Sequence, residues 1–348
     1  MLYYDEQFYI TLLWLFVIIL IIIAVTLVIF NLVRHYVLFQ PTRDQKWFPR
    51  KEECREVSVI SDEDYPFSSD SKRCNDYTQD FTNAYLIIGD RKHKAFTKAQ
   101  ITKISQSRMF NIGDLHYINI WKFEQFKDNR VVLYFHGNND NISYRKYVID
   151  ICYILKLNLV LVDYRGYGDS AGIPESKFLL QDAKTAYLHL RDTYEANEII
   201  IWGESLGGIA AIWTAHKFKC HALILLSTFS DLRTVVEKMD APESMKSMFS
   251  RVIHSKLMSN GKWIRDVNVP TVIIHSQEDD ILPYINAQMN YDAVGTSEKK
   301  LITIAGPHAH PSFTYDNLTA LLRFINIDDD IVTNQNKINQ ILDIVNNL

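Results

Sequence analysis

One serine lies in a short motif that is typical of a nucleophile. Gly203-Glu204-Ser205-Leu206-Gly207 has the form G-x-S-x-G, and it directly follows the β-branched run EIIIW (198–202). Small flanking residues allow a tight turn from a strand into a helix, which pushes the serine hydroxyl out of the sheet. A helix in the segment that follows, IAAIWTAHKF, would add free N–H groups and partial positive charge beside the hydroxyl. We therefore expect Ser205 to act as a nucleophile.

A serine hydroxyl is a weak nucleophile at neutral pH and needs a base, which a carboxylate in turn orients. For this motif the acid should come next along the chain, just past a strand. Asp279 follows the run TVIIH (271–275) and is the first choice for this role. Its neighbours Glu278 and Asp280 compete with it, and Asp231 after the preceding run is a further alternative.

The histidine base should follow the acid, again just past a strand. The run KLITI (300–304) is followed by Ala305-Gly306-Pro307-His308-Ala309-His310. His308 would take the Ser205 proton and return it to the leaving group, and His310 is the alternative. The oxyanion of a tetrahedral intermediate also needs two N–H donors, which we expect from the backbone of Leu206 and of Asn138. Asn138 lies in the loop after the run VVLYFH (131–136).

The elements that would position these residues recur from about residue 115 onward. Short apolar runs alternate with longer amphipathic segments, and continuously apolar runs are typical of strands buried on both faces of a parallel sheet. This alternation predicts an α/β fold with a mostly parallel, doubly wound sheet, whose ligands bind at the carboxyl ends of the strands. The expected strands are 131–136, 158–163, 198–202, 222–226, 271–275 and 300–304, and helical spacing appears in 175–194 and 313–325.

An apolar stretch near the N-terminus predicts one transmembrane helix over residues 10–33. These 24 residues carry no charge, and as a helix they would rise about 36 Å, enough to cross a hydrocarbon core. No Lys or Arg precedes the span, whereas Arg34, Arg43 and Lys46 follow it. The positive-inside rule then places the large C-terminal part in the cytosol, with a lumenal or extracellular domain as the alternative.

The rest of the chain divides around this span. We expect an N-terminal tail over 1–9, a linker or insertion with early strands over 34–112, and the α/β domain over 113–328. Within that domain, 231–266 is a lid candidate that holds Met239, Met245, Met248 and Met258. A flexible apolar lid would suit an acyl chain, although a helix packed on the sheet explains the methionines equally well. Residues 329–348 form a tail helix that could pack on the domain or on a partner.

Composition excludes several classes of function. The net charge of −4 over 37 basic and 41 acidic residues argues against nucleic-acid binding. None of the four cysteines forms a CxxC pair, and no metal-ligand spacing or phosphate loop occurs, so no cofactor or metal is expected. Cys152 and Cys220 lie in apolar segments and should be buried. Cys54 and Cys74 would pair only in an oxidising compartment, and free thiols are the alternative.

Four segments resemble the membrane-anchored α/β-hydrolase domain-containing proteins, including the branch with a single N-terminal span. They are LYFHGNNDNIS (133–143), LVLVDYRGYGDSAG (159–172), GESLGG (203–208) and HSQEDDILP (275–283). The resemblance covers roughly residues 115–325, and DYRGYGDS is its most specific piece. It implies the α/β-hydrolase fold, with the nucleophile at Ser205, the acid at Asp279 and the base at His308. Asp140 and Ser276 stand where the family usually has glycine.

The resemblance also implies a serine hydrolase that cleaves carboxylic ester, thioester or lipid acyl bonds at a membrane surface. Its substrate would be an acyl ester, a lipid or an acylated protein. Two alternatives remain open at this point. One is a membrane-tethered serine peptidase, since related folds cleave peptides. The other is a binding protein that keeps the fold without turnover.

Overall fold

The computed structural model of the protein describes residues 14, 16–21, 39–42, 83–87, 95–96, 116–124, 126, 129–170, 172–238, 242–243, 246–247 and 260–348. The chain divides into two units, residues 1–40 and 41–348. Of the transmembrane helix expected over 10–33, residues 14 and 16–21 are described, and they are helical. No helix among the described residues is both long and apolar enough to cross a membrane. The remainder of that span lies outside the described residues.

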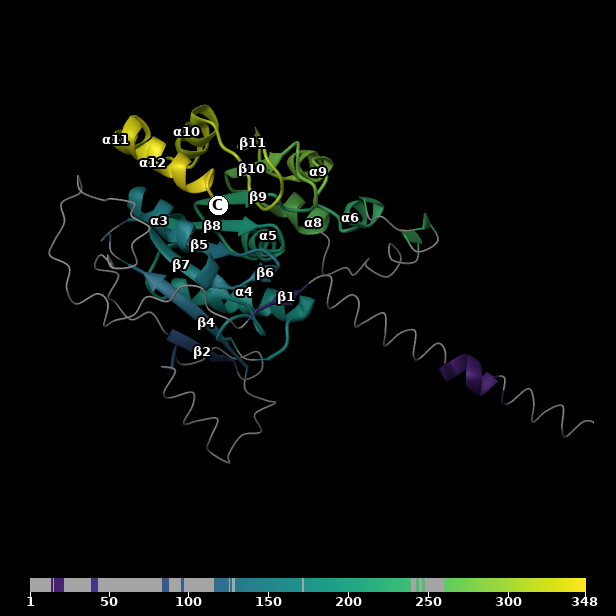
Figure 1. Ribbon diagram of the computed structural model, residues 1–348. Helices are drawn as coiled ribbons and strands as arrows, with labels where there is room; N and C mark the ends of the chain where they lie inside the picture. Colours follow the sequence, from purple (N-terminus) through teal and green to yellow (C-terminus); the bar gives the residue numbers. More distant parts are fainter. Residues whose placement is uncertain are drawn as a thin grey trace, which may run out of the picture. The chain divides into compact units, whose positions relative to one another are not determined.

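A nine-stranded sheet, counted over the described residues, forms the centre of the second unit (Figure 1). Its order is β11-β10-β9-β8-β5-β7-β4-β2-β3. Strands from β11 to β7 pair in parallel, and β4, β2 and β3 pair antiparallel at one edge. This is the α/β-hydrolase fold expected from the sequence. The bounds are β2 (Asn83–Ile87), β3 (Ala95–Phe96), β4 (His116–Phe123), β5 (Val131–Phe135), β7 (Asn158–Asp163), β8 (Ile199–Glu204), β9 (Ala222–Leu226), β10 (Thr271–Ser276) and β11 (Lys299–Ile304).

The apolar runs form strands because both of their faces are covered. Every residue of β5, β7, β9 and β10 is buried. One face shares a hydrophobic core with α3 (Lys146–Ile154), α10 (Tyr315–Phe324), α11 (Asp329–Val332) and α12 (Gln335–Val345). On the other side, α4 (Ser176–Leu190) and α5 (Gly207–Lys217) pack on β5, and α8 (Asn260–Trp263) packs on α5 (Figure 1).

Shorter elements complete the described chain. Helix α9 (Ile285–Ala293) packs against β10 and β11. The described parts of the lid candidate 231–266 include α6 (Arg233–Lys238), α8 and η4 (Ile264–Asp266), and its four methionines lie outside the described residues. Cys152 and Cys220 are buried free thiols as expected, whereas Cys54 and Cys74 also lie outside the described residues. The remaining short elements are β1 (Gln40–Pro41), β6 (Asn139–Asp140), η2 (Ile142–Tyr144) and η3 (Ala196–Glu198).

The C-terminal helix α12 packs on the domain, which is one of the two possibilities left open by its sequence. Ile338, Ile341 and Val345 recur at helical spacing and are buried against α3 and α10. We therefore predict that Ile338→Ala destabilises the protein by roughly 2–5 kcal/mol, because it removes a buried side chain and leaves a cavity. Equilibrium urea unfolding of the full chain measures this, with Asn339→Ala on the exposed face of α12 as the matched control. Equal stability of the two variants would contradict the packing.

Candidate active site

Ser205 lies on a tight turn between β8 and α5. Its φ of 51° is in the left-handed region, which is strained for a residue with a side chain. Two hydrogen bonds to the backbone of Ser205 hold the turn. The Ser205 N–H donates to the Leu226 carbonyl at 2.9 Å, and the Thr228 hydroxyl donates to the Ser205 carbonyl at 2.7 Å. A Cβ on Gly207 would lie 2.0 Å from the Phe135 carbonyl oxygen. The glycine of the motif therefore permits close contact between the turn and β5.

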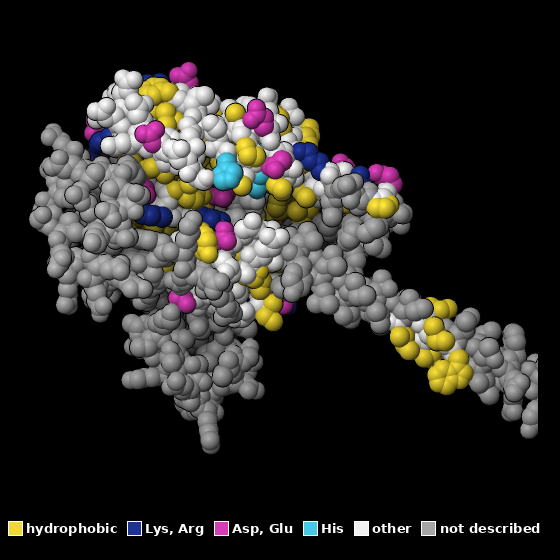
Figure 2. Space-filling view, in the orientation of Figure 1, with side chains coloured by type: hydrophobic (Ala, Val, Ile, Leu, Met, Phe, Trp, Pro, Cys, Tyr) yellow, Lys and Arg dark blue, Asp and Glu magenta, His cyan; other side chains and the backbone are white. Residues whose placement is uncertain are grey.

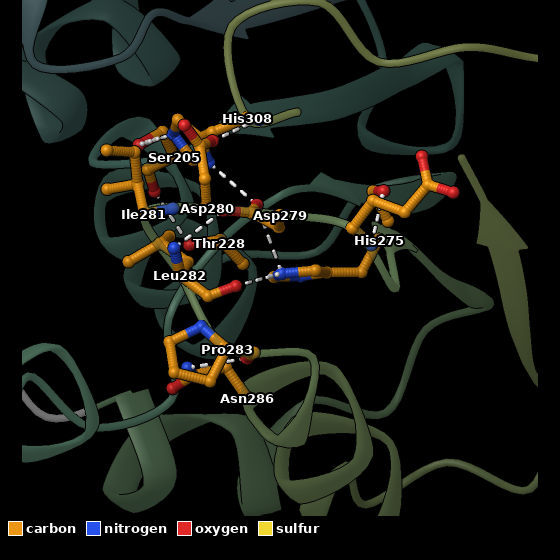
Figure 3. Close-up of polar contacts among 12 residues, drawn as sticks. Ser205, Thr228, His275, Asp279, Asp280, Ile281, Leu282, Pro283, Asn286 and His308 are labelled. Atoms are coloured by element: carbon orange, nitrogen blue, oxygen red, sulfur yellow. Dashed lines mark hydrogen bonds and ion pairs between the residues drawn. The ribbon is translucent and has the colours of Figure 1, made fainter. Parts of the chain in front are cut away.

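The structure brings Ser205, His308 and Asp279 together at the carboxyl ends of β8, β10 and β11 (Figure 3). The Ser205 Oγ lies 3.1 Å from His308 Nε2, and His308 Nδ1 lies 2.7 Å from Asp279 Oδ2. A hydroxyl, an imidazole and a carboxylate joined in this order can move a proton from the serine to the imidazole. The structure thus places Ser205, His308 and Asp279 within hydrogen-bond distance of one another in this order.

The competing carboxylates have other partners. Glu278 accepts a hydrogen bond from the Gly306 N–H at 2.8 Å, and Asp280 accepts one from the backbone N–H of His308 at 3.0 Å. Both therefore fix the loop that carries His308 and do not reach its ring. Asp231 pairs with Arg233.

Two further residues of these loops also have defined places. His310 Nδ1 lies 2.7 Å from the Leu348 carbonyl oxygen on the exposed side of its loop. Ser276, which stands where the family usually has glycine, donates to the Gly306 carbonyl and accepts from the Glu278 N–H at 3.0 Å. Its hydroxyl therefore joins the loop of the acid to the loop of the base.

Asp279 sits among hydrogen-bond donors. Burial alone would raise the pKa of this carboxyl, but hydrogen bonds from His275 and His308 and from the Leu282 N–H outweigh it and hold the pKa well below its usual range. Its Oδ1 accepts from the N–H groups of Ile281 at 2.9 Å and Leu282 at 2.6 Å. The carboxylate is thus ionised and fixed beside the His308 ring.

The loop expected to supply an oxyanion donor lies against the nucleophile. A Cβ placed on Gly137 would come within 3.4 Å of the Ser205 Cβ. Asp140, where the family usually has glycine, has φ 64°, so aspartate adopts the left-handed conformation that this loop requires. Leu206 is the N-cap residue of α5 and has helical backbone angles. Both predicted donor residues, Asn138 and Leu206, therefore belong to segments that border Ser205.

The DYRGYGDS segment (163–170) forms hydrogen bonds that hold the loop after β5 in place. The Tyr164 hydroxyl donates to the His136 carbonyl at 2.7 Å, and the Tyr167 hydroxyl donates to the Asn138 carbonyl at 2.9 Å. Asp163 accepts from the Ile142 N–H at 2.9 Å. Burial raises the pKa of Asp163 to about 7 and, together with the Arg145 charge, lowers that of His136 to about 3. The most distinctive motif of the sequence thus supports a loop and does not contact the Ser205 hydroxyl in any described interaction.

Sequence reasoning missed two groups of residues near the nucleophile. The Glu204 carboxylate accepts hydrogen bonds from the Tyr134 and Tyr147 hydroxyls, and the Arg145 charge lies close enough to affect both tyrosines. No motif marked this cluster. The second is His275, whose Nε2 lies 3.3 Å from Asp279 Oδ2 and which no motif indicated. Its position four residues before Asp279 was the one available signal. Among the described residues, no cluster of His, Cys, Asp and Glu could hold a metal ion.

Comparisons with known proteins agree with this architecture. A family model described as serine aminopeptidase, S33, matches residues 127–266. Protein bem46 of Schizosaccharomyces pombe is 28% identical over 53% of this chain and 61% of its own length. An uncharacterized membrane protein of Saccharomyces cerevisiae is 28% identical over 53% of this chain and 66% of its own length. The chain thus spans less than two thirds of these two relatives. Alpha/beta hydrolase domain-containing protein WAV2 of Arabidopsis thaliana is 26% identical over 59% of this chain and 72% of its own length.

Among solved structures, the chain is similar to the esterase Pf2001 of Pyrococcus furiosus, with a TM-score of 0.48 and 18% identity over 61% of this chain and 85% of that chain. Alpha/beta hydrolase domain-containing protein 10 from mouse has a TM-score of 0.46 and 19% identity over 64% of this chain and 97% of that chain. The strand order of the sheet, parallel from β11 to β7 with an antiparallel edge, defines the fold. The chain has the α/β-hydrolase fold.

Proposed function

We propose that this protein is a serine hydrolase that cleaves carboxylic ester or thioester bonds of acyl substrates. The observation that carries the proposal is the hydrogen-bonded series from Ser205 Oγ through His308 to Asp279, placed at a strained turn. His308 Nε2 takes the proton as Ser205 Oγ attacks the acyl carbon, and the carboxylate of Asp279 stabilises the imidazolium that forms. The backbone N–H groups of Leu206 and Asn138 stabilise the oxyanion.

The tetrahedral intermediate then collapses. The bond from the acyl carbon to the alcohol or thiol breaks, and His308 returns its proton to that leaving group, which leaves the acyl group on Ser205. A water molecule attacks this acyl-enzyme, again with His308 as the base, and releases the carboxylic acid and the free serine. These steps use protein groups alone, so the proposal needs no cofactor.

Apolar side chains beside the site support an acyl substrate. Ile281, two residues after Asp279, is 53% exposed, and Ile285 on α9 is 47% exposed. Large apolar side chains on a surface are informative when they gather beside a site. Figure 2 shows histidine side chains at the surface with hydrophobic side chains next to them on the same face. We infer that an acyl chain of the substrate lies along this apolar surface.

We also propose that residues 10–33 anchor the protein in a membrane, with the hydrolase domain in the cytosol. The uncharged sequence of this span supports the anchor, and one yeast relative is named a membrane protein. An anchor of this kind would keep the site near lipids and acylated proteins. Alkaline carbonate extraction of membranes tests it, because an integral protein stays in the pellet. Release into the supernatant would contradict the anchor.

A second candidate is a serine peptidase, because the matching family model is described as serine aminopeptidase, S33. The same triad chemistry cleaves amides, so the leaving group decides between the two. Turnover of matched acyl esters, acyl thioesters and aminoacyl amides by the full chain tests the proposal. We expect esters or thioesters to give the higher kcat/KM. A preference for the amides would favour the peptidase, and no turnover of any substrate by folded protein would favour a binding protein.

The hydrogen bond from Tyr167 to the loop of Asn138, the expected oxyanion donor, leads to a prediction about a single residue. Tyr167→Phe removes the hydrogen bond to the Asn138 carbonyl and leaves the ring in place, so the loop is held less firmly. We expect kcat for the preferred ester to fall roughly fivefold to twentyfold with little change in KM, because one transition-state donor is less well placed. Tyr194→Phe, a tyrosine outside the loops that form the site, is the control. Equal kcat for both variants would argue against Asn138 as a donor.

A further inference from the structure

A second histidine contacts the acid of the proposed triad. His275 is in β10, and its side chain is completely buried. Its Nε2 lies 3.3 Å from Asp279 Oδ2 and 3.0 Å from the Leu282 carbonyl oxygen (Figure 3). The same carboxylate oxygen thus lies between two imidazoles, since His308 Nδ1 approaches it at 2.7 Å. The proposed mechanism gives His275 no role.

The surroundings of His275 decide which of its nitrogens carries the proton. A carboxylate oxygen and a carbonyl oxygen can only accept hydrogen bonds, so Nε2 must be the donor. The other nitrogen, Nδ1, is buried and meets no hydrogen-bond partner among the described residues. A proton on Nδ1 would therefore be buried without an acceptor, which is costly. His275 therefore donates from Nε2.

We propose that His275 is a positioning residue, which holds the Asp279 carboxylate so that Oδ2 faces the His308 ring. This inference rests on the proposed hydrolase function. The N–H groups of Ile281 and Leu282 fix Oδ1, and His275 fixes the other oxygen from the side opposite His308. Without His275, the Oδ2 end of the carboxylate is held by His308 alone. Small rotations of a catalytic group lower the rate of a reaction that depends on alignment.

The hydrogen bond from His275 also affects the negative charge of Asp279, which lies beside the His308 ring. A hydrogen bond to a carboxylate draws negative charge away from it, so loss of the bond makes Asp279 a stronger partner for protonated His308. The other charged or titratable groups around this pair stay in place. Lys238 Nζ donates to the Asp279 carbonyl at 2.9 Å, Asp280 accepts from the His308 N–H, and the Tyr284 ring packs edge-on against His275. Removing the donor should therefore strengthen the attraction between the Asp279 carboxylate and protonated His308.

The test compares His275→Phe with His275→Gln in the full chain. Phenylalanine keeps the volume of the ring and removes the donor, whereas glutamine places an N–H group near the position of Nε2. For Phe we expect kcat on the ester substrate to fall on the order of tenfold with KM unchanged, and the acid limb of the kcat/KM pH profile to move to higher pH. For Gln we expect most of kcat to return and the acid limb to stay near its wild-type position. Fluorophosphonate titration measures the concentration of reactive active sites. Dividing the rate by this concentration separates a lower kcat from a loss of folded protein.

His221→Gln is the matched control, because His221 is a half-buried histidine that binds Arg130 and the Ile325 carbonyl just before the start of β9. A proton NMR spectrum adds a measurement that needs no turnover, since the proton between His308 Nδ1 and Asp279 should shift in His275→Phe and not in the control. Wild-type kcat and an unmoved proton in His275→Phe would overturn the inference. Absence of Ser205-dependent turnover in the wild-type protein would instead overturn the proposed function, while the proton shift would still decide the role of His275.

Discussion

Ser205→Ala is expected to abolish covalent labelling by a fluorophosphonate probe and to lower kcat/KM for the preferred acyl substrate by at least about 10³-fold. The probe is attacked by an activated serine, and Ser205 Oγ is the hydroxyl that lies 3.1 Å from an imidazole nitrogen. The loss should fall on kcat, because alanine removes the nucleophile and leaves the surfaces that bind the acyl chain. Gel fluorescence after probe treatment and initial rates on the ester measure the two effects.

Ser227→Ala is the matched control for this experiment. Ser227 follows β9, the neighbouring strand, and it is a buried serine that also has positive φ, at 45°. It should keep both labelling and turnover, since positive φ alone does not activate a hydroxyl. Labelling that survives in folded Ser205→Ala would identify a different nucleophile. A folded wild-type protein that reacts with neither probe nor substrate would support the alternative of a binding protein.

Much of the fold could be predicted because the strands are short, apolar and buried on both faces. The expected strands 158–163 and 222–226 coincide with β7 and β9, and 198–202 falls within one residue of the start of β8. The expected run 131–136 is longer than β5 by His136, whose side chain binds the loop carbonyl of Gly137. Continuous apolar runs give a clear pattern, and strand ends depend on loop contacts that no local pattern contains.

Other elements gave weaker signals. Strand β4 pairs antiparallel with β7 and carries polar residues such as Asn119 between buried apolar ones, so it lacks a continuous apolar run. Helix α9 has little contrast between its faces, with Ile285 and Met289 exposed and Asn286 and Asn290 buried. Its two buried asparagines are the reverse of the expected pattern for a surface helix. Tertiary contacts decide such elements, and the sequence does not contain them in local form.

The site was predictable in its order and not in its detail. The sequence placed an acid after β10 and a histidine after β11, but it offered three adjacent carboxylates. Only the fold distinguishes them, because neighbouring residues in a loop point in different directions. Glu278 and Asp280 turn toward backbone N–H groups, and Asp279 turns inward toward His308. The same reasoning explains why His275 escaped notice, since its contact with Asp279 depends on the turn that follows β10.

Asp279→Asn is the second large effect, with kcat expected to fall on the order of 10³–10⁴-fold and KM to change little. The amide must place either its oxygen or its NH2 group toward His308. If the oxygen stays with the N–H groups of Ile281 and Leu282, the NH2 group faces His308 Nδ1 and can only donate to it. His308 then carries its proton on Nε2, which is the nitrogen that must accept the proton of Ser205. If the amide is reversed, its NH2 group faces the two backbone N–H groups, and their hydrogen bonds are lost.

Asp279→Asn should also change the stability of the protein in a pH-dependent way, which substitutions of the neighbouring carboxylates should not do. Because hydrogen bonds hold the pKa of Asp279 below its unfolded value, the ionised carboxylate contributes stability above about pH 4, and this contribution is lost as pH falls through the folded pKa. Asp279→Asn should therefore cost roughly 1–3 kcal/mol at pH 7, and the difference from wild type should shrink below about pH 4.

Glu278→Gln and Asp280→Asn are the controls, since an amide oxygen still accepts from Gly306 or His308 N–H. Both should keep kcat within severalfold of wild type. A larger loss in either control than in Asp279→Asn, measured by initial rates and by thermal unfolding across pH, would move the role of the acid to that residue.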